Sequence, residues 1–325
     1  MRAIRVHRFG GPEVLVLDEV PDPVAGPGQL LIRNHAIGVN PVDTYIRNGA
    51  YARLPEVPFV PGWDGAGVVE AVGDEVHRFA PGDRVYFSGT SAGRGWGAYA
   101  EKVCCAEVNV HPLPGALTYA QGAAIGVPYA TAHRALFHRA RCHPGETVLV
   151  HGASGGVGQA AVQLARALGC TVIGTAGTED GLAFVRSQGA DHVVRHGTPS
   201  AMDEIRAHTG GRGVDVIVEM LANMNLDKDL GLLATFGRVV IVGNRGRIEI
   251  DPRQTMGKDS SILGMSLWNA SDEELLQLHQ EMGPQFAEGV LVPAVGKRFP
   301  LAEAAAAHAA VLESGARGKV VLEVA

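Results

Sequence analysis

The chain has 325 residues, which is enough for two domains with a hydrophobic core each. Hydrophobic residues make up 46% and charged residues 19% of the chain, a composition that excludes a disordered protein. A net charge of −6 gives no basic field for a nucleic-acid partner, and no apolar run of about 18 residues predicts a membrane span.

The first third of the chain has short apolar runs broken by glycine and proline, with little helical periodicity. Strands are predicted over residues 2–7, 13–19, 29–37, 64–73, 83–88 and 98–110. One short helix is predicted after Asn40, because Asn is a good N-cap, Pro41 suits the first helical position and Gly49 suits the end. This pattern is typical of an antiparallel, barrel-like unit.

From about residue 119, predicted strands and helices alternate. Helices are expected over residues 119–126, 129–141, 157–168, 180–188, 200–208 and 226–235, and strands over 146–150, 171–175, 191–194, 214–218 and 238–242. This alternation indicates βαβ units and a parallel sheet that is covered on both faces. After about residue 262 the pattern loosens, with helices predicted at 271–282 and 301–314 and a last strand from Lys319 to Val324.

The most informative motif is the loop HGASGGVG at residues 151–158. It follows an apolar strand and opens a helix, so its backbone N–H groups and the helix dipole favour an anion at the same place. Gly152, Gly155 and Gly158 leave out side chains where a pyrophosphate would approach. A tight strand-to-helix turn also uses glycine, but the flanking strand and helix favour a dinucleotide site.

The kind of dinucleotide is indicated by the end of the next strand. An acidic residue there usually binds the adenosine ribose of NAD, whereas this chain has the small residues Thr175 to Thr178. The room for a 2′-phosphate favours NADP, although Glu179 and Asp180 follow closely and either could turn inward. Arg195 and His196, after the next predicted strand, are candidate phosphate partners or a solvated pair in a loop.

Metal sites are not predicted. The cysteines at positions 104, 105, 142 and 170 form no C-x-x-C pair, and His133 and His138 have no cysteine at ligand spacing. Few scattered cysteines fit a reducing cytosol, so we expect a cytoplasmic protein whose thiols are buried and structural.

Long sequence strings identify the family that this chain resembles. They are NPVDTYIR at 40–47, GAAIGVPY at 122–129, VLVHGASGGVG at 148–158, GTAGTE at 174–179 and EMLANMNL at 219–226. With them the chain resembles the medium-chain dehydrogenase/reductase superfamily, and within it the quinone oxidoreductase branch typified by zeta-crystallin. The resemblance implies an α/β fold: a Rossmann-type parallel-sheet domain at 123–262, and a GroES-like barrel catalytic domain at 1–122 completed by 263–325.

The chain departs from the zinc-dependent members of that superfamily at the catalytic metal. Those enzymes keep a cysteine where this chain has Asn40, and a His-Glu pair where it has Trp63 and Asp64. Without a Lewis acid, reduction of an electrophilic acceptor is favoured over alcohol oxidation. The resemblance therefore implies a zinc-independent, NADPH-dependent quinone oxidoreductase that forms a homodimer or homotetramer. The alternatives are an NADPH-dependent reductase of activated C=C bonds and a non-catalytic, crystallin-like NADPH-binding protein.

The resemblance also implies functional positions. Asn40 and Tyr45 match catalytic positions beside the nicotinamide, although Tyr45 could merely pack. Trp63 and the loop at residues 93–97 are bulkier than expected and could limit acceptor size. Arg245 could instead make an ion pair at the rim, and Met265 and Leu267 could be core residues. The positions matched to the cofactor are, for the pyrophosphate, Ser154, Gly155, Gly156 and Val157; for the adenosine phosphate, Gly177 and His196; and for the ribose and nicotinamide, Asn225, Val242, Gly243, Asn244, Arg245, Met265, Ser266 and Leu267.

Overall fold

The computed structural model describes residues 1–89 and 97–324, which divide into two compact units. Unit 1 contains Met1–Val127, Ser271–Glu313 and the segment from Gly318 onward. Unit 2 contains Pro128–Ala270 and Ser314–Arg317. Residues 93–96 of the loop that could limit acceptor size lie outside the described residues.

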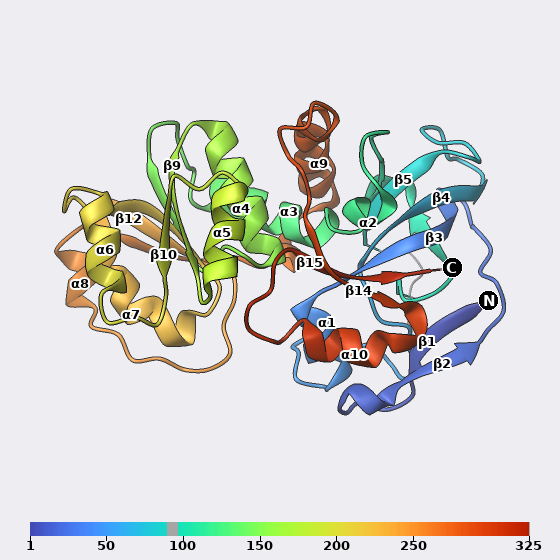
Figure 1. Cartoon of the computed structure of the whole chain (residues 1–325). Coiled ribbons are helices and arrows are strands. Elements are labelled where there is room, and N and C mark those ends of the chain that lie inside the picture. Colours follow the sequence, from blue (N-terminus) through green and yellow to red (C-terminus); the bar gives the residue numbers. More distant parts are fainter. Residues whose placement is uncertain (90–96, 325) are drawn as a thin grey trace. The chain divides into compact units, whose positions relative to one another are not determined.

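Unit 2 is built on a six-stranded parallel sheet (Figure 1). Its strands, in spatial order, are β10 (His192–Arg195), β9 (Thr171–Ala176), β8 (Thr147–Val150), β11 (Val214–Glu219), β12 (Leu233–Ile241) and β13 (Ser261–Gly264). All five pairings are parallel, and β8 is buried along its whole length. The predicted Rossmann-type sheet is therefore confirmed.

Helices cover this sheet. They are α3 (Gly126–His133), which continues as a π-helical turn over Arg134–Arg139, α4 (Gly156–Leu168), α5 (Glu179–Ser187), α6 (Ala201–His208), α7 (Ala222–Leu232) and α8 (Arg253–Met256). The predicted helix 226–235 was wrong at its end, because β12 begins at Leu233 directly after α7. Leu233 pairs with Val214 of β11, so sheet pairing overrides the local helical preference.

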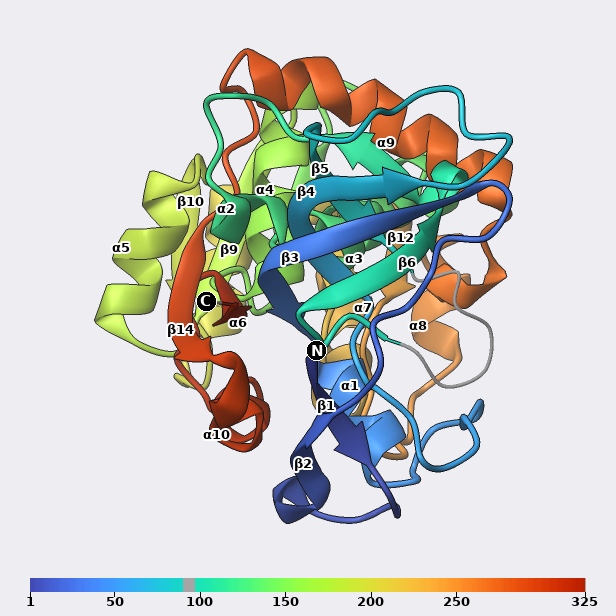
Figure 2. The same cartoon turned by 90° about the vertical axis from the view of Figure 1, so that its right-hand side faces the viewer.

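Unit 1 is built on a mainly antiparallel sheet, which Figure 2 shows from the side of β3 (Gln29–Val39). The other strands are β4 (Asp64–Val72), β5 (Arg84–Ser88), β6 (Lys102–Ala106), β7 (Val110–Pro112), β14 (Val295–Pro300) and β15 (Lys319–Glu323), while β1 (Arg2–Val6) and β2 (Leu15–Glu19) form a hairpin. The single strand predicted over 98–110 is two strands, β6 and β7, separated by a short turn.

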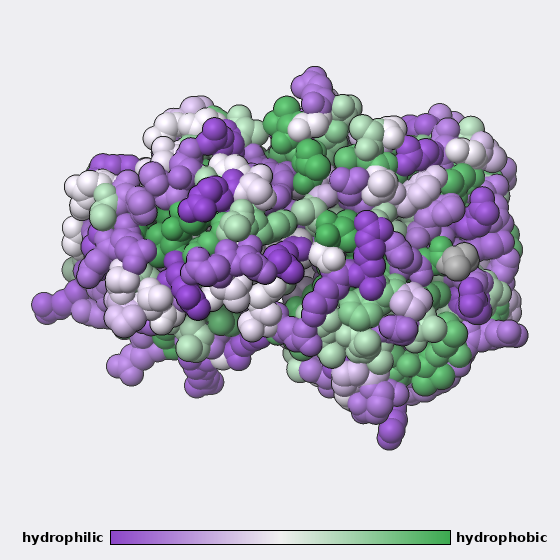
Figure 3. Space-filling view, viewed as in Figure 1, coloured by the Kyte–Doolittle hydropathy of each residue, from purple (hydrophilic) through white to green (hydrophobic). Residues whose placement is uncertain are grey.

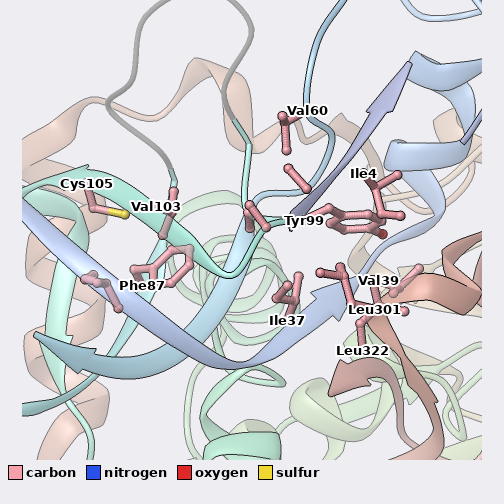
Figure 4. Packing of buried hydrophobic residues seen from close by; sticks show 14 of the residues in the cluster. Ile4, Ile37, Val39, Val60, Phe87, Tyr99, Val103, Cys105, Leu301 and Leu322 are labelled. Atoms are coloured by element: carbon pink, nitrogen blue, oxygen red, sulfur yellow. The ribbon is translucent and has the colours of Figure 1, made fainter. Parts of the chain in front are cut away.

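The two ends of the chain complete unit 1 together. β15 pairs antiparallel with β3 and parallel with β14. The helices of this unit are α1 (Pro41–Arg47), α2 (Tyr119–Gly122), α9 (Asp272–Ala287) and α10 (Ala304–Ala310). The core in Figure 4 accordingly mixes distant segments, with Ile4 and Ile37 in the same cluster as Leu322. Tyr99 lies inside this apolar cluster with no exposed surface, so its hydroxyl needs an internal partner.

Hydrophilic side chains cover most of the face shown in Figure 3, interrupted by smaller hydrophobic areas. Within residues 1–89 and 97–324, no helix combines the length and the apolar character needed to cross a bilayer.

Candidate functional site

The glycine loop connects the carboxyl end of β8 to the first turn of α4. Gly155 is the N-cap of α4 in an extended conformation and, having no side chain, makes no capping hydrogen bond to the first-turn amides. The amides of the sequence Gly156-Val157-Gly158 therefore remain available to an anion at the positive end of the helix dipole.

Glycine occupies three positions of this loop for different structural reasons. Gly152 has a positive φ of 56°, which favours glycine. A Cβ atom on Gly158 would lie 2.3 Å from the Gly152 carbonyl oxygen, so the loop closes tightly on itself there. A Cβ on Gly155 would meet its nearest described atom only at 3.5 Å. Packing within the chain therefore does not require glycine at position 155, and a missing side chain there suits a backbone that a pyrophosphate would approach.

A buried cluster of polar side chains contacts the start of the glycine loop. His151 Nε2 lies 2.9 Å from Asp229 Oδ1 and 3.6 Å from Glu219 Oε2. Its Nδ1 lies 3.4 Å from Thr175 Oγ1, which also accepts a hydrogen bond from the Gly152 N–H at 3.2 Å. Burial lowers the pKa of His151, but the hydrogen bond to Asp229 and the negative charges of Asp229 and Glu219 together outweigh burial and raise the pKa above its usual value. The cluster therefore fixes the start of the loop.

This cluster is also where potential metal ligands converge among the described residues, since one ligand atom each of His151, Glu219 and Asp229 lies within 4.8 Å of the others. Glu219 already accepts hydrogen bonds from Asn225 Nδ2 at 3.1 and 3.3 Å. Because its members bond one another, we interpret it as a structural scaffold that also orients Asn225. The absence of a metal stays a prediction.

The adenosine end of the predicted cofactor site has more positive charge than the sequence suggested. Gly177 lies against His196, because a Cβ on Gly177 would be 2.9 Å from His196 Nε2. The two acidic residues that could have opposed a phosphate both face arginines, in the exposed pairs Arg195–Glu179 at 3.4 Å and Arg317–Asp180 at 2.9 Å. Sequence reasoning missed Arg317, which lies 137 positions after Asp180 and has no motif around it.

The remaining predicted cofactor residues follow the carboxyl ends of β11, β12 and β13. The N–H groups of Val242 and Gly243 donate to the Glu219 carbonyl oxygen at 2.9 and 3.1 Å. Met265, just after β13, donates its N–H to Ile241 O at 3.1 Å. Parallel strands end at one edge of the sheet, so the structure brings the glycine loop and these segments to the same edge. The full set at this carboxyl edge, with Met265 and Leu267 half-buried rather than core, is Asn225, Val242, Gly243, Asn244, Arg245, Met265, Ser266 and Leu267.

Unit 1 contains a second candidate site, a buried triangle of Asn40, Asp64 and Lys319. Lys319 Nζ lies 3.1 Å from Asp64 Oδ2 and also donates to Asn40 Oδ1. Asn40 Nδ2 donates to the same Asp64 oxygen at 2.9 Å. Asp64 Oδ1 accepts the Val127 N–H at 2.7 Å. The three residues are at most 3% exposed, so the Asn40 amide has a fixed orientation.

Three strands bring this triangle together. Asn40 follows β3, Asp64 begins β4 and Lys319 begins β15, and β3 pairs with both other strands. A Cβ on Gly38 would lie 2.9 Å from both Asp64 Cβ and Lys319 Cε, which shows how closely these strands pack. Sequence reasoning missed Lys319. The sequence does hold one signal, a single lysine at the start of an apolar strand. A lysine that is buried there needs a polar or charged partner.

A chain of hydrogen bonds fixes the helix that carries Asn40 and Tyr45. Arg47 Nη1 lies 3.2 Å from His308 Nδ1, His308 Nε2 lies 3.0 Å from the Tyr99 hydroxyl, and that hydroxyl donates to Asp43 Oδ2 at 3.2 Å. Arginine can only donate, so His308 accepts at Nδ1 and carries its proton on Nε2. The donors therefore run in one direction, from Arg47 to Asp43.

Asp43 closes this chain at the start of α1, where it also accepts the Asn40 N–H at 2.8 Å. Tyr45, on the same helix, is half-buried. The network thus connects α1 to α10 and holds the backbone of the predicted catalytic residue Asn40.

The buried carboxyl group of Asp43 makes stability depend on pH. Burial raises the pKa of Asp43 from 3.8 to about 7, against the hydrogen bond from the Asn40 N–H. The folded state therefore holds this proton more tightly, and its contribution to stability is lost as the pH rises through about 7. Asp43→Asn keeps an acceptor oxygen but cannot ionise, so we expect the free energy of unfolding to fall less steeply between about pH 4 and pH 7 than in the wild type.

Urea unfolding across this pH range measures the effect. The exposed Asp74→Asn variant serves as the control and should keep the wild-type slope. An unchanged slope in Asp43→Asn would show that another group causes the pH dependence.

These features define a class of protein. A glycine loop on a parallel sheet, together with a mainly antiparallel unit built from both ends of the chain, is the architecture of a medium-chain dehydrogenase or reductase. Two family models agree: one for the alcohol dehydrogenase GroES-like domain matches residues 26–115, and one described as zinc-binding dehydrogenase matches residues 156–282.

Individual proteins give a narrower assignment. The chain is 50% identical over 324 residues to the human quinone oxidoreductase, covering 99% of this chain and 97% of that protein. A solved NAD-dependent alcohol dehydrogenase superposes with a TM-score of 0.92 at 33% identity, covering 100% of both chains. A mycobacterial structure complexed with NADPH superposes with a TM-score of 0.89 at 34% identity, covering 99% of this chain and 100% of that one. The chain belongs to the quinone oxidoreductase family of the medium-chain dehydrogenases/reductases.

Proposed function

We propose that this chain is an NADPH-dependent, zinc-independent quinone oxidoreductase. The similarity to the human quinone oxidoreductase over 99% of the chain supports this function most strongly. The glycine loop supports the cofactor, because the missing side chain at Gly155 and the first-turn amides of α4 suit a pyrophosphate. Bound NADPH supplies a hydride, for which proximity and orientation matter more than acid catalysis.

The chain's own residues would divide the binding work. Residues 154–157 of the glycine loop would hold the pyrophosphate, and Gly177 with the adjacent His196 would border the adenosine phosphate. The arginines at positions 195 and 317 neutralise Glu179 and Asp180 near that phosphate. Asn225 and the segments 242–245 and 265–267 would run along the ribose and nicotinamide. Asn40, oriented by Asp64 and Lys319, and Tyr45 would contact the nicotinamide and the acceptor.

The triangle in unit 1 supports zinc independence. Where zinc-dependent relatives keep a cysteine, Asn40 has its amide oxygen bonded to the Lys319 ammonium. A positive charge is thus already present, and the carboxylate of Asp64 is bonded to both neighbours. These contacts favour a site whose side chains bond one another and need no metal.

We therefore expect dialysis against a strong chelator to leave kcat and KM unchanged. Elemental analysis of the purified protein should find zinc far below one ion per chain. A zinc-dependent alcohol dehydrogenase treated in parallel is the control and should lose its activity. Activity that is lost on dialysis and restored by Zn²⁺ would contradict zinc independence.

Tyr45 is expected to assist rather than to drive the reaction. A reduced quinone can take its proton from water, so Tyr45→Phe, which keeps the ring, should lower kcat only modestly. Steady-state kinetics with NADPH and a naphthoquinone measure this effect. A loss of more than about 10³-fold, as for a principal acid–base group, would show that Tyr45 is the proton donor.

The function itself is tested by acceptor choice. Stopped-flow oxidation of NADPH should be fast with 1,2- or 1,4-naphthoquinone and slow with a crotonyl thioester. Turnover of the thioester alone would assign the chain to the reductases of activated C=C bonds. Turnover of neither, with NADPH still bound, would assign a binding role. The same assay with NADH measures the preference for the 2′-phosphate.

The setting of the enzyme completes the proposal. Four free cysteines fit a reducing compartment, so we propose that the protein acts in the cytoplasm on small-molecule quinones. A homodimer or homotetramer is expected, and light scattering of the purified protein distinguishes the two.

A further inference from the structure

Two cysteines that the proposed reaction does not use lie next to each other in unit 2. Cys142 Sγ and Cys170 Sγ are 3.5 Å apart, although the residues are 28 positions apart in the sequence. Each residue is 6% exposed, so both thiols lie just beneath the surface. Neither residue belongs to the glycine loop or to the buried triangle.

The backbone already holds the two segments together. The Gly145 N–H donates to Gly169 O at 3.0 Å, and the Thr171 N–H donates to Glu146 O at 2.9 Å. The cysteine amides are fixed as well, that of Cys142 to Leu136 O at 2.9 Å and that of Cys170 to Ala165 O at 3.0 Å. Because these bonds hold the backbone, the approach of the sulfur atoms from 3.5 Å to a disulfide distance of about 2.0 Å would have to come mainly from side-chain rotation.

The local contacts give the two thiols different reactivities. Cys170 Sγ lies 3.4 Å from the His143 carbonyl oxygen and next to the Cys142 thiol. Hydrogen bonding between the thiols lowers the pKa of Cys170 and raises the pKa of Cys142. The two sulfur atoms are in contact, so whichever thiol is oxidised first has the other in place as its resolving thiol.

We propose that Cys142 and Cys170 form a reversible oxidation site that hydroperoxides convert to an intramolecular disulfide. Cys170 releases its thiol proton, the thiolate attacks the peroxide ROOH and the O–O bond breaks, which leaves a sulfenic acid and an alkoxide that takes up the released proton as ROH. Cys142 then attacks the sulfenic sulfur, the S–S bond forms and water leaves. In sum, two thiols and ROOH give a disulfide, ROH and water: the sulfur atoms lose two electrons and the peroxide gains them.

The position of the pair determines what the disulfide does. Cys142 lies in the segment that enters β8, and Cys170 immediately precedes β9, so both lie at the amino ends of these strands. The glycine loop follows the carboxyl end of β8. The crosslink therefore stabilises unit 2 by closing a loop in the unfolded chain, and it leaves the cofactor edge unchanged. This inference does not depend on the proposed function.

Peptide mapping tests the proposal directly. The whole protein is treated with hydrogen peroxide, its free thiols are blocked, and it is digested with trypsin. Cleavage after Arg141, Arg166 and Arg186 places the two cysteines on separate peptides, 142–166 and 167–186. We expect these peptides to be joined after oxidation and separated by a reductant. The adjacent Cys104 and Cys105 are an internal control, because side chains of consecutive residues in a strand point to opposite faces.

Thermal unfolding supplies the second measurement. The oxidised protein should have a higher Tm than the reduced protein, and its Kd for NADPH should be the same. Cys170→Ala and Cys142→Ala should each abolish the linked peptide and the shift in Tm. Oxidation of either thiol to a sulfinic acid without a linked peptide, or a linked form with a lower Tm, would overturn the proposal.

Discussion

Lys319→Met is expected to lower the free energy of unfolding by about 3–5 kcal/mol, the usual cost of breaking a buried ion pair from one side. The substitution keeps the length of the side chain but leaves the Asp64 carboxylate without its cation. Asp64 has no exposed surface, so water cannot replace the lost partner. Asn40 would lose the donor to its amide oxygen at the same time. Urea unfolding of the whole chain measures this cost.

A double-mutant cycle separates the ion pair from the packing of the lysine stem. Asp64→Asn combined with Lys319→Met removes both charges, so the double variant should recover most of the stability that the single variant loses. Lys297→Met is the matched control, because Lys297 pairs with Glu313 where both side chains are more than half exposed, and it should cost less than about 1 kcal/mol. A Lys319→Met variant as stable as this control would remove the argument for a tightly coupled triangle.

Gly155→Ala should raise the Kd for NADPH about tenfold or more, equivalent to at least about 1.4 kcal/mol of binding free energy. The added methyl group meets its nearest described atom at 3.5 Å, and the φ of −78° suits alanine, so the loop can keep its shape. Alanine is a poorer N-cap than glycine, so we expect the substitution to cost the fold about 1 kcal/mol at most. The methyl group would instead occupy the surface where the pyrophosphate approaches.

Fluorescence titration with NADPH and thermal unfolding together test this prediction. Gly257→Ala, which adds a methyl group at the end of α8, is the control and should change neither affinity nor fold. Gly158→Ala should behave differently, because its Cβ would lie 2.3 Å from the Gly152 oxygen and would distort the loop itself. If Gly155→Ala binds NADPH as tightly as the wild type, the pyrophosphate does not lie over this loop.

The sequence predicted those parts of the molecule whose physical cause is local. The alternation of strands and helices identified the parallel sheet, and the spacing of Gly152, Gly155 and Gly158 identified the glycine loop before α4. The N-cap Asn40 and the following Pro41 placed α1 correctly. In each case the residues that determine the structure lie within one turn or one βα unit of it.

The parts that could not be predicted depend on contacts between distant positions. Lys319 meets Asn40 and Asp64 across 279 and 255 positions, and nothing near residue 319 encodes that pairing. The bond between Tyr99 and His308 spans 209 positions. The start of β12 at Leu233 has the same cause, because its neighbour in the sheet ended α7 earlier than the local pattern indicated.

The pairing of β15 with β3 has a consequence for how the protein is made. Residues 128–270 of unit 2 are contiguous and leave the ribosome well before β15. Most of this unit can therefore fold while the rest of the chain is still being synthesised. Unit 1 begins first but must wait, because Asp64 has no cation and β3 lacks one neighbour until Lys319–Glu323 has emerged. Biogenesis is thus expected to be out of chain order, with the middle of the polypeptide folding before its beginning. Pulse proteolysis of stalled nascent chains ending before residue 318 would detect a protected unit 2 beside a cleavable N-terminal third.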